Sequence, residues 1–459
     1  MSVRSAVLLP TRFPLTTAEK VEIEYHLDWL LRHFGAEPIY DRQPFTPVDP
    51  QFRVFATRAG IDLEQALEWV RELLPFDTDG CELVLMADGE TCPDHPDMIK
   101  ITAHEATDHE ELVAHIACHL SARYLHRLPQ HKLERTIPDR LMDLIPVYFG
   151  LGILCANTAL KFSQYSVGES AYHHYRKSRS VEARVFGSTL AYLAGEREER
   201  KIAWARYLTP DARVPFKQTL RYLRKTNDSL FSSKFSTEVF GNTNDGQLIG
   251  KLPGATAGTQ YGILQQLFFN TLEISPAETQ QRLASLMPQL PDLLGMRDKD
   301  VAMMASHVAS HFESLDEPVI AALKDQMMER DPELRIAALN AITTVATPGQ
   351  LKPWELRSFL RESDMRLVNA AAMGLVQRGE KAEELSTDLL AAIKRMASQG
   401  VSDFLVHLCG ALVTICGEPD HRLQEYFNQD PDLLADALSA VERWRGVAAP
   451  DKFDPEDEA

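Results

Sequence analysis

The last third of the chain repeats one signal, an aspartate that opens a short helix, and this repetition restricts the fold more than any other feature. Asp300, Asp331 and Asp364 each precede an apolar run rich in small residues, at spacings of 31 and 33 residues, and Asp430 does the same further on. An aspartate at a helix start accepts unpaired backbone amides. A single helical pair cannot bury its apolar face, so we predict stacked helical pairs over residues 291–446.

One of these starts carries a motif. The run Asp331–Leu339 reads Asp-Pro-Glu-Leu-Arg-Ile-Ala-Ala-Leu, with proline at the first helical position, where no amide is needed. It resembles the second-helix signature of HEAT repeats, in which the acid and the arginine connect neighbouring repeats. The resemblance implies a C-terminal α-solenoid, and we expect its long concave surface to bind a protein partner.

The charge balance argues against nucleic acid as a partner. Acidic residues outnumber basic ones by 66 to 48, giving a net charge of −18, and such a field repels phosphate backbones. The densest basic stretch, at Lys217, Arg221, Arg224 and Lys225, falls on one side of a predicted helix. We interpret it as a solvated helix face.

Neither a signal peptide nor a membrane span is expected. The apolar run at the start stops at Pro10, and the most apolar segment, Leu144–Leu160, is interrupted by Pro146 and Asn157. We predict a buried helix there. The six cysteines form no Cys-x-x-Cys pair, as in reduced proteins, and we therefore expect a cytoplasmic location.

The first half reads as a mixed α/β domain. Helical periodicity covers residues 22–34 and 63–74, whereas residues 81–86 and 98–101 are short apolar runs typical of buried strands. A further helix is predicted to begin near Asp108. The expected fold is thus mainly α, with an α+β domain over residues 1–235.

The helix after Asp108 carries His115 and His119. Residues four apart in a helix lie on one face, about 6 Å apart, so the two imidazoles can share one zinc ion. The pair His307 and His311 repeats this spacing in the C-terminal repeats. We interpret that second pair as ordinary residues of a repeat helix.

Residues 80–230 resemble the zinc-peptidase domain of gluzincins, as found in uncharacterised bacterial proteins. The resemblance is carried by the histidine pair, by Asp139 and Asp143 twenty residues later, and by the apolar segment that follows them. It implies a zincin-like fold in which His115, His119 and Asp139 are the metal ligands. Asp143 corresponds to the acid that binds a ligand histidine and fixes its tautomer.

The family's catalytic base is missing. Gluzincins place a glutamate directly after the first histidine, where it takes a proton from zinc-bound water, and this chain has Ile116. Asp139 also stands where the family has the longer glutamate. Possible replacements are Glu111, one turn before His115, or an imidazole from a loop at His173 and His174. We interpret Glu111 instead as a partner of the helix dipole.

Other candidates are Glu105, which precedes the motif, and Cys118, which faces away from the histidine pair. We therefore predict a pseudo-metallopeptidase domain without peptidase activity, and the residues leave open whether zinc is bound. A linker and helical connector is expected at 236–290, and an acidic, disordered tail at 447–459. The predicted function is a non-catalytic protein-interaction scaffold. The alternative is an atypical zinc-dependent hydrolase with an unrecognised base. Neither the partner nor the oligomeric state follows from the sequence.

Overall fold

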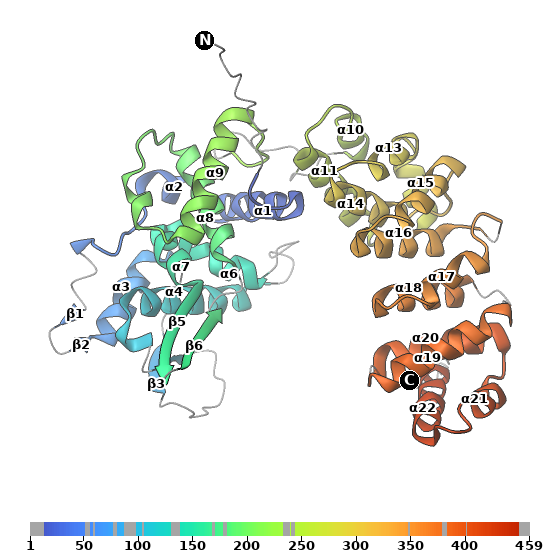
Figure 1. The fold of residues 1–459 in the computed structure, drawn as a ribbon. Helices are drawn as coiled ribbons and strands as arrows, with labels where there is room; N and C mark the ends of the chain where they lie inside the picture. Colours follow the sequence, from blue (N-terminus) through green and yellow to red (C-terminus); the bar gives the residue numbers. More distant parts are fainter. Residues whose placement is uncertain are drawn as a thin grey trace, which may run out of the picture. The chain divides into compact units, whose positions relative to one another are not determined.

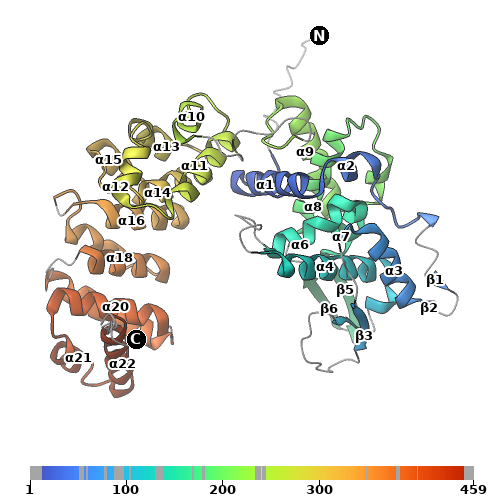
Figure 2. The same ribbon diagram turned by 180° about the vertical axis from the view of Figure 1, so that it is seen from behind.

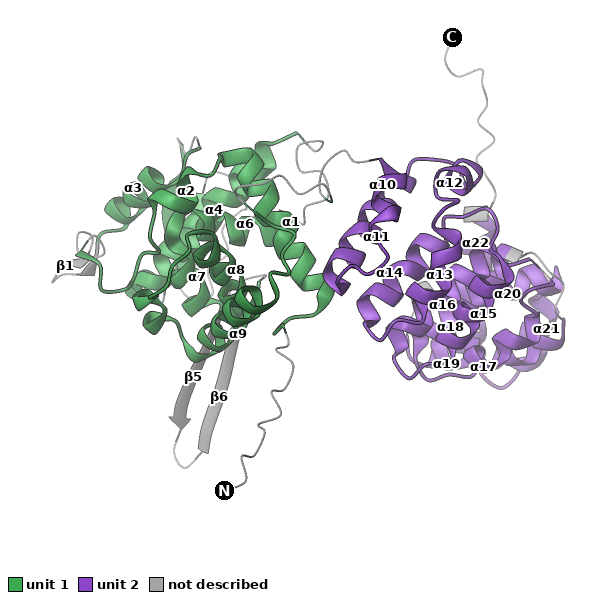
Figure 3. Cartoon of the chain, turned by 90° about the horizontal axis from the view of Figure 1, so that it is seen from above, with its two compact units in different colours: residues 1–242 green, residues 243–459 purple. Residues whose placement is uncertain are grey.

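The chain divides between residues 242 and 243 into two units, which are described one at a time from a computed structural model (Figures 1 and 3). The division falls inside the segment 236–290 in which a linker was predicted. The described part of the chain is mainly helical, as the sequence predicts. It comprises residues 13–50, 56–57, 60–76, 80–86, 98–102, 105–129, 138–167, 170–177, 181–232, 239, 244–347, 349–378, 383–400 and 402–448.

Unit 1 combines helices with two-stranded sheets in its described part. The sheets pair β1 (Ala56–Thr57) with β2 (Gly60–Ile61), β3 (Glu82–Met86) with β4 (Met98–Thr102), and β5 (Leu160–Val167) with β6 (Ser170–Lys177). Only the β3–β4 pair is parallel among these. The helical elements are α1 (Thr17–Phe34), α2 (Glu37–Asp41), α3 (Leu63–Leu73), η2 (Glu105–Thr107), α4 (His109–Arg127), α6 (Pro138–Pro146), η3 (Val147–Leu151), α7 (Gly152–Thr158), α8 (Ala183–Glu196), η4 (Ala203–Tyr207) and α9 (Pro210–Thr226).

The parallel pair β3–β4 and helix α4 form the part of unit 1 that holds the predicted metal motif. Both strands were predicted from apolar runs, and the structure confirms them, with Ile99 and Ile101 of β4 fully buried. Helix α3 contacts β3. Helix α4 contacts β4 and also packs against α6 and α7. One continuous apolar core therefore surrounds α4.

The apolar segment predicted as one buried helix is helical but interrupted. Helices α6 and α7 are joined by the π-helical turn η3, in which Gly150 adopts φ 94°, a conformation that a residue with a side chain rarely takes. The Gly150 carbonyl thereby accepts the backbone N–H of Phe45. The stretch Asp139–Thr158 is long and apolar enough to cross a membrane, yet 89% of it is buried, as expected of a core helix.

Helices α8 and α9 make a close pair, because Gly187 lets the two backbones approach. A Cβ atom at Gly187 would lie 2.1 Å from the carbonyl oxygen of Ala212 on α9. The residues of helix α8 are almost all buried. The basic residues Lys217, Arg221, Arg224 and Lys225 lie on α9 and are exposed, which confirms the solvated face.

Unit 2 is helical throughout its described residues. The helices that follow the unit boundary pack within this unit, since α10 contacts α11 and α11 contacts α14. The elements are α10 (Asp245–Gly250), α11 (Ala257–Thr271), α12 (Pro276–Arg282), η5 (Met287–Gln289), α13 (Leu290–Leu294), α14 (Lys299–Ala309), α15 (Glu317–Met327), α16 (Pro332–Val345), η6 (Pro353–Leu356), α17 (Arg357–Leu360), α18 (Met365–Arg378), η7 (Glu383–Leu385), α19 (Ser386–Ser398), α20 (Ser402–Cys416), α21 (Asp420–Tyr426) and α22 (Pro431–Ala448).

Alternate helices of unit 2 lie side by side in one series. Helix α14 contacts α16, α16 contacts α18, α18 contacts α20, and α20 contacts α22, and Figure 2 shows them in this order. We call these five the stacked helices. The flanking helices α13, α15, α17, α19 and α21 each pack against a member of the stack. Small residues on the stacked helices are buried between neighbours, as with Ala338 and Ala371.

The starts of the stacked helices are regular, and one prediction needs correction. Asp331 caps α16 through bonds from Glu333 N and Leu334 N, and Asp364 accepts from Arg366 N at the start of α18. Helix α14, however, is capped by Asp298, not by Asp300. Asp298 reaches the amides because the chain is still extended there. The caps at 298, 331 and 364 therefore follow one another at equal intervals of 33 positions.

The last helix runs further than predicted. Helix α22 extends to Ala448, beyond the predicted end of the repeats at residue 446. The carbonyl of Asp430 accepts Leu434 N, so Asp430 stands at the helix start as expected. The acidic tail predicted from residue 447 lies outside the described residues from position 449 onward.

Candidate functional site

Helix α4 presents the histidine pair. It begins as predicted, with the Asp108 side chain accepting the amides of Glu110 at 3.0 Å and Glu111 at 3.1 Å. His115 and His119 follow on the same helix, and both are half-buried. The helix therefore brings the two imidazoles to one face, at the margin of the core.

A buried carboxylate accompanies the first histidine. Glu105, in the turn η2 before α4, is only 4% exposed, and its Oε1 lies 3.5 Å from Nδ1 of His115. The other oxygen, Oε2, accepts the backbone N–H and the hydroxyl of Thr102 at the end of β4. A carboxylate beside Nδ1 orients the imidazole ring so that Nε2 can meet another partner. Histidines that bind metal ions commonly have such a carboxylate at their second nitrogen. Glu105 is thus placed to orient His115 and not to act as a base.

Ile116 belongs to the core. Its side chain is fully buried among the apolar residues that α4 packs against α6 and α7. A glutamate at this position would have to be buried there, at a large cost in desolvation. The environment of α4 therefore suits isoleucine and offers no space to a general base at this position.

The two aspartates of α6 differ in their surroundings. Asp139 lies in the first turn of the helix and is exposed, whereas Asp143 is fully buried. The Oδ2 atom of Asp143 accepts the backbone N–H of Val181 at 3.0 Å, just before α8. Asp143 therefore connects α6 to the entry of α8.

Among the described residues, the histidine pair is not joined by further ligands into a metal-binding group. Within the described ranges, no three or more histidine, cysteine, aspartate or glutamate side chains are grouped so as to hold a metal ion. The ligand set His115, His119 and Asp139 remains a prediction of the resemblance. His173 and His174, for which a loop was expected, lie in strand β6 opposite Gln164 and Ser163 of β5, and are not in a loop.

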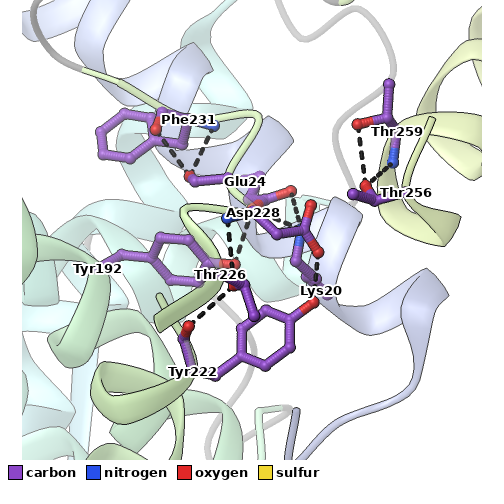
Figure 4. Close-up of polar contacts among 10 residues, drawn as sticks. Lys20, Glu24, Tyr192, Tyr222, Thr226, Asp228, Phe231, Thr256 and Thr259 are labelled. Carbon is purple, nitrogen blue, oxygen red and sulfur yellow. Dashed lines mark hydrogen bonds and ion pairs between the residues drawn. The ribbon is translucent and has the colours of Figure 1, made fainter. Parts of the chain in front are cut away.

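A second polar cluster in unit 1 was not found from the sequence. Lys20 of α1 is 3% exposed, and its Nζ lies 3.0 Å from Oε1 of Glu24, one turn later, and 3.6 Å from Oδ1 of Asp228 (Figure 4). Tyr192 of α8 donates to Glu24 at 2.7 Å, and Tyr222 of α9 donates to Asp228. We call these five residues the Lys20 cluster.

The Lys20 cluster joins distant parts of unit 1. It connects α1 to α8, to the end of α9 and to the segment after α9 that includes Asp228. That segment is also held locally, since the hydroxyl of Thr226 accepts the backbone N–H of Asp228, and Ser229 bonds both backbone groups of Phe231. The cluster therefore holds the segment after α9 against α1 and α8.

Burial determines the protonation of these groups. Desolvation raises the pKa of Glu24 above its usual value, and Lys20 and Tyr192 oppose that rise. Burial and the nearby Glu24 charge raise the pKa of Tyr192, and burial raises that of Tyr222 together with the bond to Asp228. Both tyrosines remain neutral donors across the neutral range. The Lys20 cluster is mostly buried, and we assign it a structural role.

One local signal for the cluster existed. Lys20 and Glu24 lie four residues apart in α1 beside the buried apolar residues Val21, Ile23 and Leu27, although Glu19 and Glu22 are also close in the sequence. A lysine and a glutamate at this spacing can meet on one helix face, and charged residues that are buried need such partners. The partners themselves, about 170 to 200 positions away, leave no mark in the local pattern.

No protein-family model matches this chain, and no curated protein matches it.

Proposed function

We propose that this protein is a non-catalytic scaffold, in which a zincin-like unit 1 without peptidase activity is joined to a HEAT-like α-solenoid that binds a protein partner. The observation that supports the proposal most is the surface chemistry of the stacked helices. No Asp, Glu, Lys or Arg occurs at positions 301–309 of α14, 336–345 of α16 or 367–377 of α18. Most of these positions are buried between helices, and the few that reach the surface are uncharged as well, in a chain that is 25% charged overall.

The surface in question lies mainly on α16 and α18. Asn340, Thr344 and Gln377 are exposed, Asn369 and Met373 are half-buried, and together we call them the uncharged strip. Thr344 approaches Gln377 across the two helices at 3.5 Å, and Asn369 contacts His407 of α20 at 2.8 Å. Depletion of charge combined with amide and methionine side chains is typical of the centre of protein interfaces.

The flanking helices differ in this respect. Glu317 and Asp325 of α15 and Lys394 of α19 are exposed charges, as on ordinary solvated helix faces. We therefore expect the partner to bind at the uncharged strip, where binding does not require charged side chains to lose their water.

The test adds the same negative charge either to the uncharged strip or to the flanking helices. The double variant Asn340→Glu/Gln377→Glu changes the uncharged strip, and Ala321→Glu/Thr387→Glu adds the same charge at exposed positions of α15 and α19. Proteins captured by the wild-type chain from a lysate of its source cells are expected to be lost with the first variant and retained with the second. Capture that is the same for both variants, or absent for the wild type, would reject the scaffold.

A second candidate is the atypical zinc hydrolase, and the contact between Glu105 and His115 favours it. A carboxylate that orients one imidazole is the arrangement found behind zinc-ligating histidines. Metal content of the purified protein distinguishes the candidates, with His115→Ala as the control. Zinc together with peptide cleavage, both lost in that variant, would establish the hydrolase. Zinc without cleavage would leave a structural site, and no stoichiometric zinc would remove the enzyme.

A further inference from the structure

The two histidines of the pair in unit 2, His307 and His311, both contact one aromatic ring. His307 lies in the last turn of α14, and His311 follows two residues beyond the end of that helix. The ring centroids of His307 and His311 lie 6.1 Å and 4.7 Å from that of Phe268 on α11. The two imidazoles are therefore brought together by tertiary packing as well as by their spacing in the sequence.

The nitrogens of this pair are differently engaged. Nδ1 of His311 lies 2.8 Å from the hydroxyl of Thr271, at the end of α11, and this contact fixes the ring while leaving Nε2 for another partner. No described residue forms a hydrogen bond or ion pair with the ring nitrogens of His307. Both rings are only half-buried. Part of each side chain therefore reaches solvent.

Both imidazoles are neutral at physiological pH. Burial lowers the pKa of His307, as does the nearby His311, and burial also lowers the pKa of His311. Neutral imidazole is the form that binds metal ions, so little proton release opposes binding.

The surroundings of the pair favour a cation. His307 and His311 stand at the C-terminal end of α14, where the helix dipole places partial negative charge. The interior of α14 contains no lysine or arginine to repel an ion. We propose that His307 and His311 bind a divalent transition-metal ion of the class that prefers imidazole, such as Zn²⁺ or Cu²⁺, with the remaining coordination positions open to water.

This inference is independent of the proposed scaffold function. It also changes the interpretation of the pair as ordinary repeat residues, because sequence spacing alone shows neither the shared contact with Phe268 nor the bond from Thr271. The site would belong to unit 2 alone and would require nothing from the motif on α4.

The first experiment measures Zn²⁺ binding to the full chain by calorimetry. We expect His307→Gln and His311→Gln each to weaken one binding event by about ten-fold or more. The variant His115→Gln should leave that event unchanged, and His421→Gln, at an exposed position of α21, controls for any surface histidine. Circular dichroism confirms that each variant remains folded.

The second experiment identifies the ligands with Cu²⁺ as the probe. In a His115→Gln background, electron paramagnetic resonance should report two imidazole nitrogens on the ion, and one after His307→Gln. Binding of Zn²⁺ that is unaltered by both His307→Gln and His311→Gln, or a Cu²⁺ spectrum that His307→Gln does not alter, would overturn the proposal.

Discussion

The two units use charged residues in opposite ways. Unit 1 buries an ion pair, with Lys20 and Glu24 at 4% and 0% side-chain exposure, whereas two ion pairs between neighbouring helices of unit 2, Lys299–Asp331 and Arg366–Glu333, lie near the solvent. Lys299 reaches Asp331 at 3.2 Å and Arg366 reaches Glu333 at 2.5 Å, and Asp331 is the least exposed of the four side chains, at 31%. A buried pair is costly to break, while an exposed pair contributes little. Unit 1 should therefore be sensitive to single charge changes, and unit 2 tolerant of them.

The largest effect is expected at the Lys20 cluster. Lys20→Met leaves Glu24 and Asp228 buried without their cation, which should destabilise unit 1 by about 3–5 kcal/mol. Hydrogen exchange followed by mass spectrometry would show the loss of protection in peptides of unit 1 and not in those of unit 2. Glu24→Leu combined with Lys20→Met should recover part of the stability. A cost below about 1 kcal/mol for Lys20→Met would remove the contrast between the units.

A close backbone contact provides the next test. In Gly187→Ala the added methyl group meets the Ala212 carbonyl, which is backbone and cannot rotate away, so unit 1 should lose about 3 kcal/mol. Gly195→Ala, on the same helix, has no atom within 4 Å of the new Cβ and should be neutral or slightly stabilising. Chemical denaturation of the two variants measures the difference. Equal stabilities would mean that α8 and α9 are less tightly packed than described.

Acid should affect unit 1 through His26. This fully buried residue of α1 has its pKa lowered to about 3, mainly by burial and also by Arg140. The neutral form therefore stabilises unit 1 fully above pH 6.5, and that contribution is lost as the pH falls from 6.5 towards 3, amounting to about 2 kcal/mol at pH 5. Denaturation at pH 7.5 and pH 5 should show this loss in the wild type and a smaller one in His26→Gln. An unchanged pH dependence in the variant would place the acid sensitivity elsewhere.

The smallest effect is expected between repeats. Lys299→Ala removes an exposed ion pair with Asp331 and should cost unit 2 less than about 1 kcal/mol. Added salt should reduce the stability of the wild type towards that of the variant, because salt screens exposed charges. A loss comparable with that of Lys20→Met would show that the ion pairs between repeats, and not the apolar contacts, hold unit 2 together.

What the sequence predicted well was local. The starts at Asp331 and Asp364, the strands β3 and β4 and the cap at Asp108 depend on patterns within a few residues. The Lys20 cluster was missed because Asp228 meets Lys20 only after folding.

At the candidate site, too, only the local features were predicted. Spacing placed His115 and His119 on one helix face, but it could not show that Glu105 lies beside His115. Likewise, Gly150 in the interrupted helix accepts a backbone bond from Phe45, about a hundred positions earlier. Contacts between distant residues leave no periodic trace, and so they were not predicted.

The equal spacing of the caps at Asp298, Asp331 and Asp364 has a consequence for how such a chain can change in length. Removal of positions 331–363 would bring Asp364 into the place of Asp331, so Lys299 would again meet an aspartate at the start of the next helix. Duplication of the same segment would likewise preserve each junction. If the segments behave as solenoid repeats do, stability is then expected to change by roughly one increment per segment. The C-terminal unit is therefore expected to tolerate gene rearrangements that remove or duplicate whole segments of this length.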